Sequence, residues 1–269
     1  MSGFYIGVDG KARKVKGAYV GIDGVARKIK KGYIGDENGK ARLVYSSGKK
    51  LSEYTVGSTV YLLESGSPVE YLIVHQGLPS SMYDASCNGT WLLRKNILNE
   101  VVWGNSSNSY KDSSAHKYLN GNMQYLFDET FLSKVKQVKI PYVNGTGSSG
   151  SVASGSNGLS AKFFLLSGYE LGWTKSNNSS FPADGAKLDY FLSGNETEAC
   201  NKRIAKYNGS AKDWYLRSPG TDDDSLVWIV PTIGLGNSRT PYSNARGLRP
   251  ALILPFDVEF DPTTNVLIG

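Results

Sequence analysis

The sequence predicts an α+β fold, in which short helices pack on antiparallel strands, preceded by a module of small β-hairpins. Three observations lead to this prediction: a repeat at the N-terminus, apolar runs with strand alternation between turn residues, and two stretches with helical spacing of apolar residues. With 269 residues, of which 40% are hydrophobic and 20% charged, the chain is long and apolar enough to bury a core.

An internal repeat occupies residues 1–46. Its three tyrosines lie 14 residues apart, at Tyr5, Tyr19 and Tyr33. Each unit places two short alternating runs around Asp-Gly or Asn-Gly, the dipeptides that tolerate the positive φ angles of tight hairpin turns. We therefore expect three β-hairpins over 1–46, a polar linker over 47–54 and a second domain over 55–269.

The repeat module needs a partner, because a hairpin of this size cannot bury a core alone. The partner is either another protein or copies of the module itself in a homo-oligomer. The first 45 positions hold ten of the 30 basic residues, and the net charge of the chain is +6. Aromatic residues interleaved with Lys and Arg leave a nucleic-acid-binding arm as an alternative. The strand periodicity favours basic residues on solvated faces instead, so we expect no nucleic-acid partner.

Strand patterns mark much of the second domain. Residues 58–77 predict two strands joined by a turn, and 89–97 and 161–173 begin further strands. A Gly/Ser-rich stretch over 143–160 holds too few apolar groups to pack. We expect a mobile loop there.

Two stretches have the spacing of helices. Residues 113–141 predict two short helices, because Ser113 or Ser114 is suited to cap a helix and Gly121 interrupts the pattern. Residues 195–206 predict another helix. No stretch has the roughly 20 consecutive apolar residues of a membrane-spanning helix, and the N-terminus has no apolar run of signal-peptide length. We therefore expect no membrane insertion and no export through a signal peptide.

The chain offers little of the chemistry that enzymes use. His75 and His116 are its only histidines, and no nucleophile elbow, phosphate loop or metal-spaced Cys/His cluster occurs. The carboxylates of "TDDDS" lack the spacing of a calcium loop. We expect no catalytic residue, no cofactor and no metal. Cys87 and Cys200 are either idle buried thiols or a disulfide, and the sequence leaves this open.

Four stretches carry a resemblance to a known family: "EYLIVHQGLPSSMYDASCNGTWLLRKNI", "KFFLLSGYELGW", "DWYLRSP" and "GLRPALILP". They are similar to uncharacterised domains from gut Firmicutes and their prophages, related to the formylglycine-generating-enzyme type of C-type lectin fold. The hairpin repeats resemble leaders of phage tail-associated proteins. The resemblance implies a C-type lectin-like domain over 55–269 and attachment of 1–46 to tail or virion proteins or to itself. It also implies a location on the virion, or in the bacterial cytoplasm before assembly.

Several members of this lectin-fold group are variable proteins of diversity-generating retroelements, in which a reverse transcriptase rewrites adenines in a C-terminal segment. The mutable AAC codons cannot become codons for Lys, Glu, Gln, Met or Trp. The first four types make up 37 of the 269 residues, yet none lies in the 46 positions between Lys212 and Glu259, where about six are expected. The resemblance therefore implies a variable region over about 221–246, with Trp228 in the fixed framework.

Alternation along "VWIVPTIGL" predicts which of its side chains vary. The set expected to be fixed comprises Trp228, Val230, Thr232 and Gly234. The other set is expected to face a ligand, together with two adjoining loops. The expected ligand-binding residues are Thr221, Asp222, Asp223, Asp224, Ile229, Pro231, Ile233, Leu235, Asn237, Ser238, Arg239, Thr240, Tyr242, Asn244 and Arg246.

These expectations combine into a retroelement-diversified receptor-binding protein of a phage or prophage, with a host-surface protein or glycan as its ligand. One alternative is a structural virion or cell-surface protein, in which the same segment is a fixed buried strand with two ordinary solvent loops. Another is an enzyme of the formylglycine-generating fold, with a metal or a reactive thiol at Cys87 or Cys200. No cysteine follows Cys200, and the sugar-binding motifs Glu-Pro-Asn and Gln-Pro-Asp are absent. The fold resemblance therefore implies neither the oxidising activity nor sugar binding.

Overall fold

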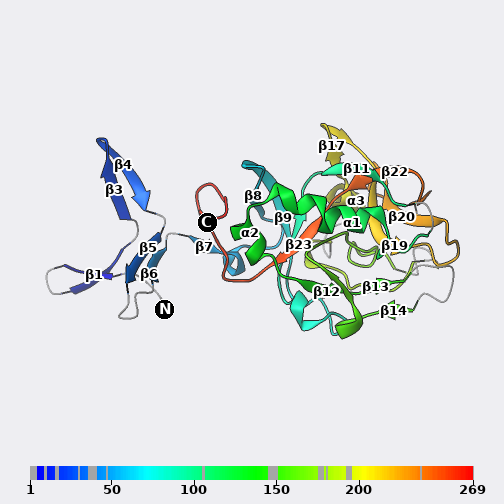
Figure 1. Cartoon of the computed structure of the whole chain (residues 1–269), viewed down its shortest axis with the longest axis horizontal. Helices are drawn as coiled ribbons and strands as arrows, with labels where there is room; N and C mark the ends of the chain where they lie inside the picture. The colour runs from blue at the N-terminus through cyan, green and yellow to red at the C-terminus, as the bar shows by residue number, and fades with distance from the viewer. Residues whose placement is uncertain are drawn as a thin grey trace.

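The computed structural model describes residues 5–8, 11–15, 18–29, 31–35, 41–46, 48–104, 107–144, 151–174, 179, 181–191, 196–236 and 238–268. The structure is α+β, as the sequence predicts, because its sheets are mainly antiparallel and its helices are short. Figure 1 shows small hairpins to one side of a larger body that contains the remaining elements.

Three hairpins form the N-terminal part, which we call the arm (residues 5–46). Its strands are β1 (Tyr5–Val8), β2 (Lys11–Lys14), β3 (Ala18–Ile22), β4 (Val25–Ile29), β5 (Lys31–Gly35) and β6 (Ala41–Ser46). The register repeats in all three, with Ile6, Val20 and Ile34 opposite Arg13, Arg27 and Arg42. In the second hairpin the tight turn has positive φ at Asp23 (52°) and Gly24 (75°), which an Asp-Gly dipeptide adopts readily.

The second hairpin leaves apolar side chains open to solvent. Val20, Ile22 and Val25 lie on one face of it, because Ile22 is directly opposite Val25 and Val20 is two positions away. They are 44 to 58% exposed, and Tyr19 on the other face is 64% exposed. Figure 1 shows this hairpin apart from the body. The arm therefore presents apolar surface that it cannot cover by itself.

The first large sheet forms the centre of the body and has the strand order β16-β23-β10-β9-β8. Its strands are β8 (Thr59–Glu64), β9 (Ser67–Gly77), β10 (Gly89–Arg94), β16 (Phe163–Phe164) and β23 (Ala251–Leu254). A tight turn at Ser65 and Gly66, with φ of 49° and 80°, joins β8 to β9 where the sequence predicts it. The inner strands β10 and β23 are buried almost throughout, which matches their nearly continuous apolar runs.

The second large sheet has the order β11-β22-β19-β20-β21. Its strands are β11 (Asn99–Val102), β19 (Trp214–Pro219), β20 (Leu226–Val230), β21 (Ser238–Pro241) and β22 (Ala245–Leu248). The contact between β19 and β22 is parallel, and the other pairs are antiparallel. Because β21 is an edge strand and β22 lies beyond β19, residues 242–244 cross over the sheet to connect them. We call them the crossover turn.

The helices are short, and side chains cap the first turns of α1 and α2. They are α1 (Ser114–Asn120), the 3₁₀ helix η3 (Asn122–Leu126), α2 (Glu129–Lys134) and α3 (Glu196–Arg203). The Ser113 hydroxyl accepts a hydrogen bond from His116 N at 3.0 Å, and α1 ends at Gly121, both as the sequence predicts. Asp128 caps α2 in the same way, accepting from Phe131 N at 2.7 Å.

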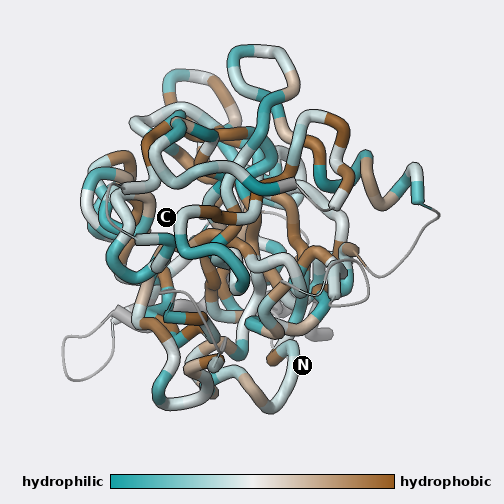
Figure 2. Tube along the Cα trace, turned by 90° about the vertical axis from the view of Figure 1, so that its right-hand side faces the viewer, coloured by the Kyte–Doolittle hydropathy of each residue, from teal (hydrophilic) through white to brown (hydrophobic). Residues whose placement is uncertain are grey.

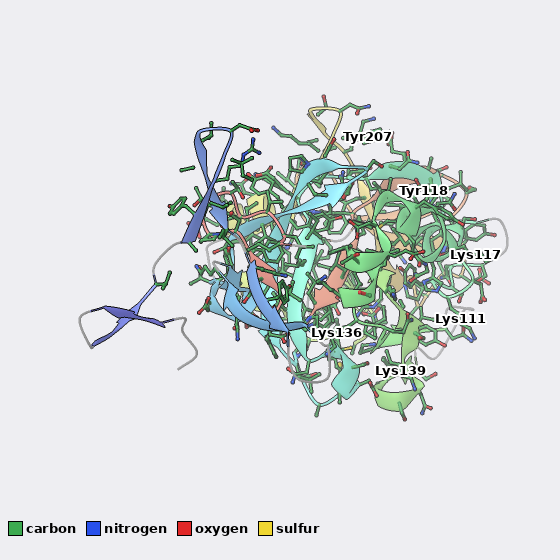
Figure 3. All side chains as sticks on the ribbon, turned by 60° about the vertical axis from the view of Figure 1, so that its left-hand side comes forward. Lys111, Lys117, Tyr118, Lys136, Lys139 and Tyr207 are labelled. Atoms are coloured by element: carbon green, nitrogen blue, oxygen red, sulfur yellow. The ribbon has the colours of Figure 1, made fainter. Side chains whose placement is uncertain are left out.

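The expectation of a mobile loop over 143–160 is wrong for residues 151–160. Here β14 (Val152–Ala153) pairs with β13 (Tyr142–Val143), and β15 (Leu159–Ala161) pairs with β12 (Val138–Ile140). Lys139, labelled in Figure 3, donates its Nζ to the carbonyl oxygen of Ser156 at 3.0 Å. Pairing with a preceding segment orders this stretch, which its composition does not reveal. Residues 145–150 lie outside the described residues.

A clasp between the two ends of the body closes the fold. In it β24 (Glu259–Phe260) pairs with β7 (Lys49–Lys50), directly after the arm. The C-terminal tail also bonds to the outer edge of β8, where Tyr61 N donates to Asn265 O at 2.8 Å. The smaller elements are η1 (Leu51–Glu53), η2 (Ala85–Cys87), η4 (Gly155–Asn157), η5 (Asp189–Phe191), β17 (Lys206–Tyr207) and β18 (Ser210–Ala211).

Large apolar side chains fill the interior of the body. Figure 2 shows hydrophobic segments running through its centre and hydrophilic ones mainly in the outer loops. Four tryptophans are completely buried: Trp91, Trp103, Trp214 and Trp228. Within the described ranges, no helix has both the length and the apolar character needed to cross a membrane.

Candidate ligand-binding surface

The segment 221–246 forms one hairpin and the loops around it. An acidic loop (221–225) leads into β20, an apolar loop (231–236) connects β20 toward β21, and the crossover turn leads into β22. The acidic loop and the end of β21 lie at one end of the hairpin, since Leu226 is opposite Pro241. The apolar loop lies at the other end.

Most of the expected ligand-binding residues reach solvent. Asp222, Asp224, Ile233, Leu235 and Asn244 are exposed. The half-buried ones are Thr221, Asp223, Pro231, Arg239, Tyr242 and Arg246. Asn237 and the side chain of Ser238 lie outside the described residues.

The expected outward position is wrong for Ile229 and Thr240, which are 4% and 2% exposed. Ile229 lies on an inner strand covered on both faces, so alternation does not separate inside from outside there. The alternation also stops at Val230, where β20 ends. Thr232, expected to be fixed and inward, is therefore exposed on the apolar loop. Trp228 and Val230 are fully buried, as expected for framework.

The first group of surface residues gathers around the acidic loop. Asp222 forms an ion pair with Arg239, whose guanidinium lies 5.2 Å from the ring centroid of the buried Trp228. The Tyr242 backbone N–H donates to the Ser225 carbonyl at 3.1 Å. Asp223 accepts from the Ser225 hydroxyl and N–H, and these bonds lower the pKa of its carboxyl. The acidic loop, Arg239 and Tyr242 therefore form one continuous surface.

The second group lies around the apolar loop, where the side chains of Ile233 and Leu235 are 59% and 42% exposed. Gly234 has a φ of 72°, and a Cβ there would collide with the Cys200 carbonyl, so the loop turns tightly over α3. A pocket of about 280 Å³ opens beside it. Its lining includes Leu235, Gly236, Trp173, Glu196, Cys200 and Arg203.

Asp213 links the second group to β22. Its carboxylate accepts from Thr232 N at 3.0 Å and lies 3.4 Å from Arg246 Nε. Arg246 therefore belongs with the apolar loop rather than with the acidic loop. The structure divides the expected ligand-binding residues into two groups at opposite ends of one hairpin.

A buried ion pair holds the strand that precedes this surface. Arg217 on β19 donates to both carboxylate oxygens of Glu170 at 2.6 Å, and both side chains are 0% exposed. Its remaining bonds go to backbone carbonyls, those of Pro141, Leu165 and Asp184. Burial lowers the pKa of Arg217, but the Glu170 charge and hydrogen bonds outweigh it, so the pKa is raised. The guanidinium stays charged and paired.

Further buried polar groups extend this pair into a network. The Tyr83 hydroxyl donates to Glu170 Oε1 at 2.7 Å and accepts from Ala186 N at 2.9 Å. The Ser218 hydroxyl lies 2.9 Å from Asp184 Oδ2. Burial raises the pKa of the Asp184 carboxyl to about 7, against the opposing effect of the Arg217 charge. The sequence marks "GYELGW" and "DWYLRSP" as framework only through the family resemblance, and the pairing itself has no local signal.

The chain directly after β22 is held by another arginine. Arg249 in "GLRP" is 1% exposed and donates to the carbonyls of Arg94 at 2.9 Å and Arg203 at 3.1 Å. Its guanidinium lies 5.0 Å from the ring centroid of Trp214. Arg94 in turn forms a two-point bond with Glu64, at 2.9 and 3.0 Å. Buried arginines thus lie on both sides of 221–246, with Arg217 on β19 and Arg249 directly after β22.

The cysteines and acidic residues bear on the question of an enzyme site. Cys87 and Cys200 are both buried and free, which settles the alternative left open by the sequence. Burial raises the pKa of the Cys87 thiol to about 12, so at neutral pH it is not a thiolate. Among the described residues, no three or more His, Cys, Asp or Glu side chains form a cluster that could hold a metal ion.

The fold and this surface define a mainly antiparallel α+β domain in which buried charged side chains hold the strands and loops from one hairpin reach solvent. Residues 88–256 match the family described as "Domain of unknown function (DUF6273)", and the chain belongs to this family. The matched region contains β10, the complete second sheet and the segment 221–246. Comparison with curated proteins gave no match, and neither did comparison with solved structures.

Proposed function

We propose that this chain is a retroelement-diversified binding protein of a phage or prophage, with a C-type lectin-like fold in its body. Its loops over 221–246 recognise a host-surface protein or glycan, and its arm attaches it to a virion or to further copies of itself. In this proposal the protein is not an enzyme, and its affinity comes from exchangeable side chains on a fixed backbone.

The contrast between the segment and its borders carries this proposal. The bordering arginines, Arg217 and Arg249, are buried and bond largely to backbone carbonyls. Between them, Ile233, Leu235 and Asp224 reach solvent without being needed for the core. A surface that changes between sister proteins requires this separation, because most substitutions of exposed side chains alter stability little.

The composition of the segment supports diversification at AAC codons. The residue types that such codons cannot produce are missing between Lys212 and Glu259, apart from tryptophan. The exceptions, Trp214 and Trp228, are both fully buried, and Trp228 stacks on Phe181 with ring centroids 3.7 Å apart. Both are therefore suited to be framework residues that are not rewritten.

The arm supports the attachment part of the proposal. Its second hairpin exposes the large apolar side chains of Tyr19, Val20, Ile22 and Val25 to solvent. Exposed apolar side chains that lie together are typical of an interaction surface. A partner strand or a second arm would cover these side chains. Repetition of the same unit three times adds binding strength through multivalency, even where one hairpin binds weakly.

The decisive test of diversification is genomic. We expect a near-copy of the DNA for 221–246 close to a reverse-transcriptase gene, differing from the coding copy mainly at adenines. Sister genes should differ at the exposed positions and agree at Trp228, Arg217 and Arg249. If no such copy exists in the genome that encodes the chain, the segment is fixed and the structural-protein alternative replaces the proposal.

Binding is tested directly with the full chain and intact gut Firmicutes cells as the probe. Two double variants, Arg239→Ala with Tyr242→Ala and Ile233→Ser with Leu235→Ser, remove exposed side chains from either end of the hairpin. We expect at least one to lower the fraction of protein bound to cells more than tenfold. Tyr125→Ala, at an 87% exposed position on η3, is the matched control. Equal binding by all variants would refute a ligand surface here.

A further inference from the structure

The acidic loop is anchored by a side chain that is far from it in the sequence. Asn108, between β11 and α1, is fully buried, and its Nδ2 lies 3.0 Å from the carbonyl oxygen of Gly220. The same nitrogen lies 3.1 Å from the carbonyl oxygens of Asp223 and Leu226. One amide group therefore contacts the backbone before, within and after the acidic loop.

The three carbonyl groups define the orientation of the Asn108 amide, because only its NH₂ group can donate to them. This group has two hydrogens, so at least one of them is shared between two carbonyls. Backbone bonds close the same loop, from Gly220 N to Leu226 O at 2.9 Å and from Leu226 N to Asp223 O at 3.3 Å. The amide thus completes a bonded ring at the base of the loop.

Residues on either side of Asn108 in the chain pack in the core. Trp103 and Tyr110, on either side of it in the chain, are 0% exposed, and their ring centroids are 5.7 Å apart. The Tyr110 hydroxyl accepts from Leu165 N at 3.0 Å, and the Tyr110 carbonyl accepts from the Ser113 hydroxyl at 2.7 Å. Core contacts of Tyr110, outside the acidic loop, therefore anchor the chain that carries the Asn108 amide.

The contacts from Asn108 reach only backbone atoms of the loop. The side chains of Thr221, Asp222 and Asp224 can therefore change without loss of a bond to it. We propose that Asn108 is a positioning residue, which keeps the backbone of the acidic loop in one conformation independently of the loop's side chains. This role rests on the proposed function for its purpose, since an exchangeable surface needs a fixed backbone.

The first experiment measures hydrogen exchange of the full chain by mass spectrometry. Asn108→Ala removes the donor, and Asn108→Asp replaces it with an oxygen that repels the three carbonyls. Asn120→Ala is the matched control, because Asn120 also bonds to backbone, to Phe163 O and Lys162 N at 2.9 Å, but away from the loop. We expect residues 220–226 to exchange about tenfold faster in the Asn108 variants than in the control.

Equal exchange of 220–226 in the Asn108 variants and in Asn120→Ala would overturn the proposal. Asn108→Ala is the variant to compare if Asn108→Asp does not fold, and Asn108→Ser if neither does. The serine hydroxyl is shorter and supplies one donor, so we expect its exchange to lie between the wild type and Asn108→Ala.

The second experiment tests independence from the loop sequence. Positions 221, 222, 224 and 225 are randomised together in the wild type, in Asn108→Ala and in Asn120→Ala, and the fraction of protease-resistant clones is counted. We expect that fraction to fall several-fold further with Asn108→Ala than with Asn120→Ala. Equal falls would mean that Asn108 adds stability without positioning the loop, and would refute the inference. Failure of the chain to bind cells would refute the proposed function and leave both of these results unchanged.

Discussion

Two regions of the C-terminal third use arginine in opposite ways. Arg217, in the strand that borders the surface, is fully buried and bonds to Glu170 and to backbone carbonyls. Arg239, on the surface, has a side chain that is 26% exposed and pairs with Asp222, which is 49% exposed. Buried contacts to backbone and core therefore position the strand, whereas the contact on the surface joins two side chains that reach solvent.

The largest expected effect comes from breaking the buried side of this comparison. Arg217→Met should lower the free energy of unfolding by about 3 to 5 kcal/mol, because it leaves the Glu170 carboxylate buried without its partner. Urea denaturation at pH 7 measures this loss. Combining it with Glu170→Leu removes the unpaired charge and should recover more than half of the loss. If Arg217→Met alone has a free energy of unfolding within about 1 kcal/mol of the wild type, this account is contradicted.

A smaller, pH-dependent effect comes from Asp184, whose carboxyl pKa burial raises from 3.8 to about 7. Between these values the folded protein keeps a proton that the unfolded chain releases, so stability falls as the pH rises through this window. Asp184→Asn removes the titration. Its stability relative to the wild type should therefore rise by about 2 to 3 kcal/mol between pH 5 and pH 8. Urea denaturation at both pH values measures the change, and the exposed Asp257→Asn serves as the control.

The smallest effect is expected on the exposed side of the comparison. Arg239→Ala should change the free energy of unfolding by less than about 1 kcal/mol, because its ion pair with Asp222 is partly solvated. Thermal and urea denaturation measure this change. A loss as large as that of Arg217→Met would show that Arg239 holds the fold and would contradict its place in the proposed exchangeable surface.

Elements controlled by one or two residues could be predicted from the sequence. The turn at Asp23 and Gly24, the cap at Ser113 and the end of α1 at Gly121 lie where local patterns predict them. The burial of Ile229 could not be predicted, because alternation along the sequence assigns it to the outward set. An inner strand is covered on both sides, so alternation there does not report exposure.

Contacts between distant segments account for most of what the sequence did not reveal. Arg217 and Glu170 are 47 residues apart, and Asn108 reaches a loop more than 110 residues away. The acidic loop, Arg239 and Tyr242 do come together, because one hairpin brings them to the same end. The sequence also predicts that Ile233 and Leu235 belong to the same ligand-binding surface. In the structure they lie at the opposite end of the hairpin from the acidic loop.

The clasp between β7 and β24 determines where mechanical load enters the body. The chain leaves the arm through Lys49–Lys50, which pairs with Glu259–Phe260, and Leu51 N adds a bond to Val258 O at 2.9 Å. Figure 1 shows this junction and the C-terminus at one end of the body, with β20 and β22 toward the other. A pull on the arm is therefore borne first by the clasp and the first sheet. If the arm attaches the protein as proposed, load enters the body at the end opposite β20 and β22.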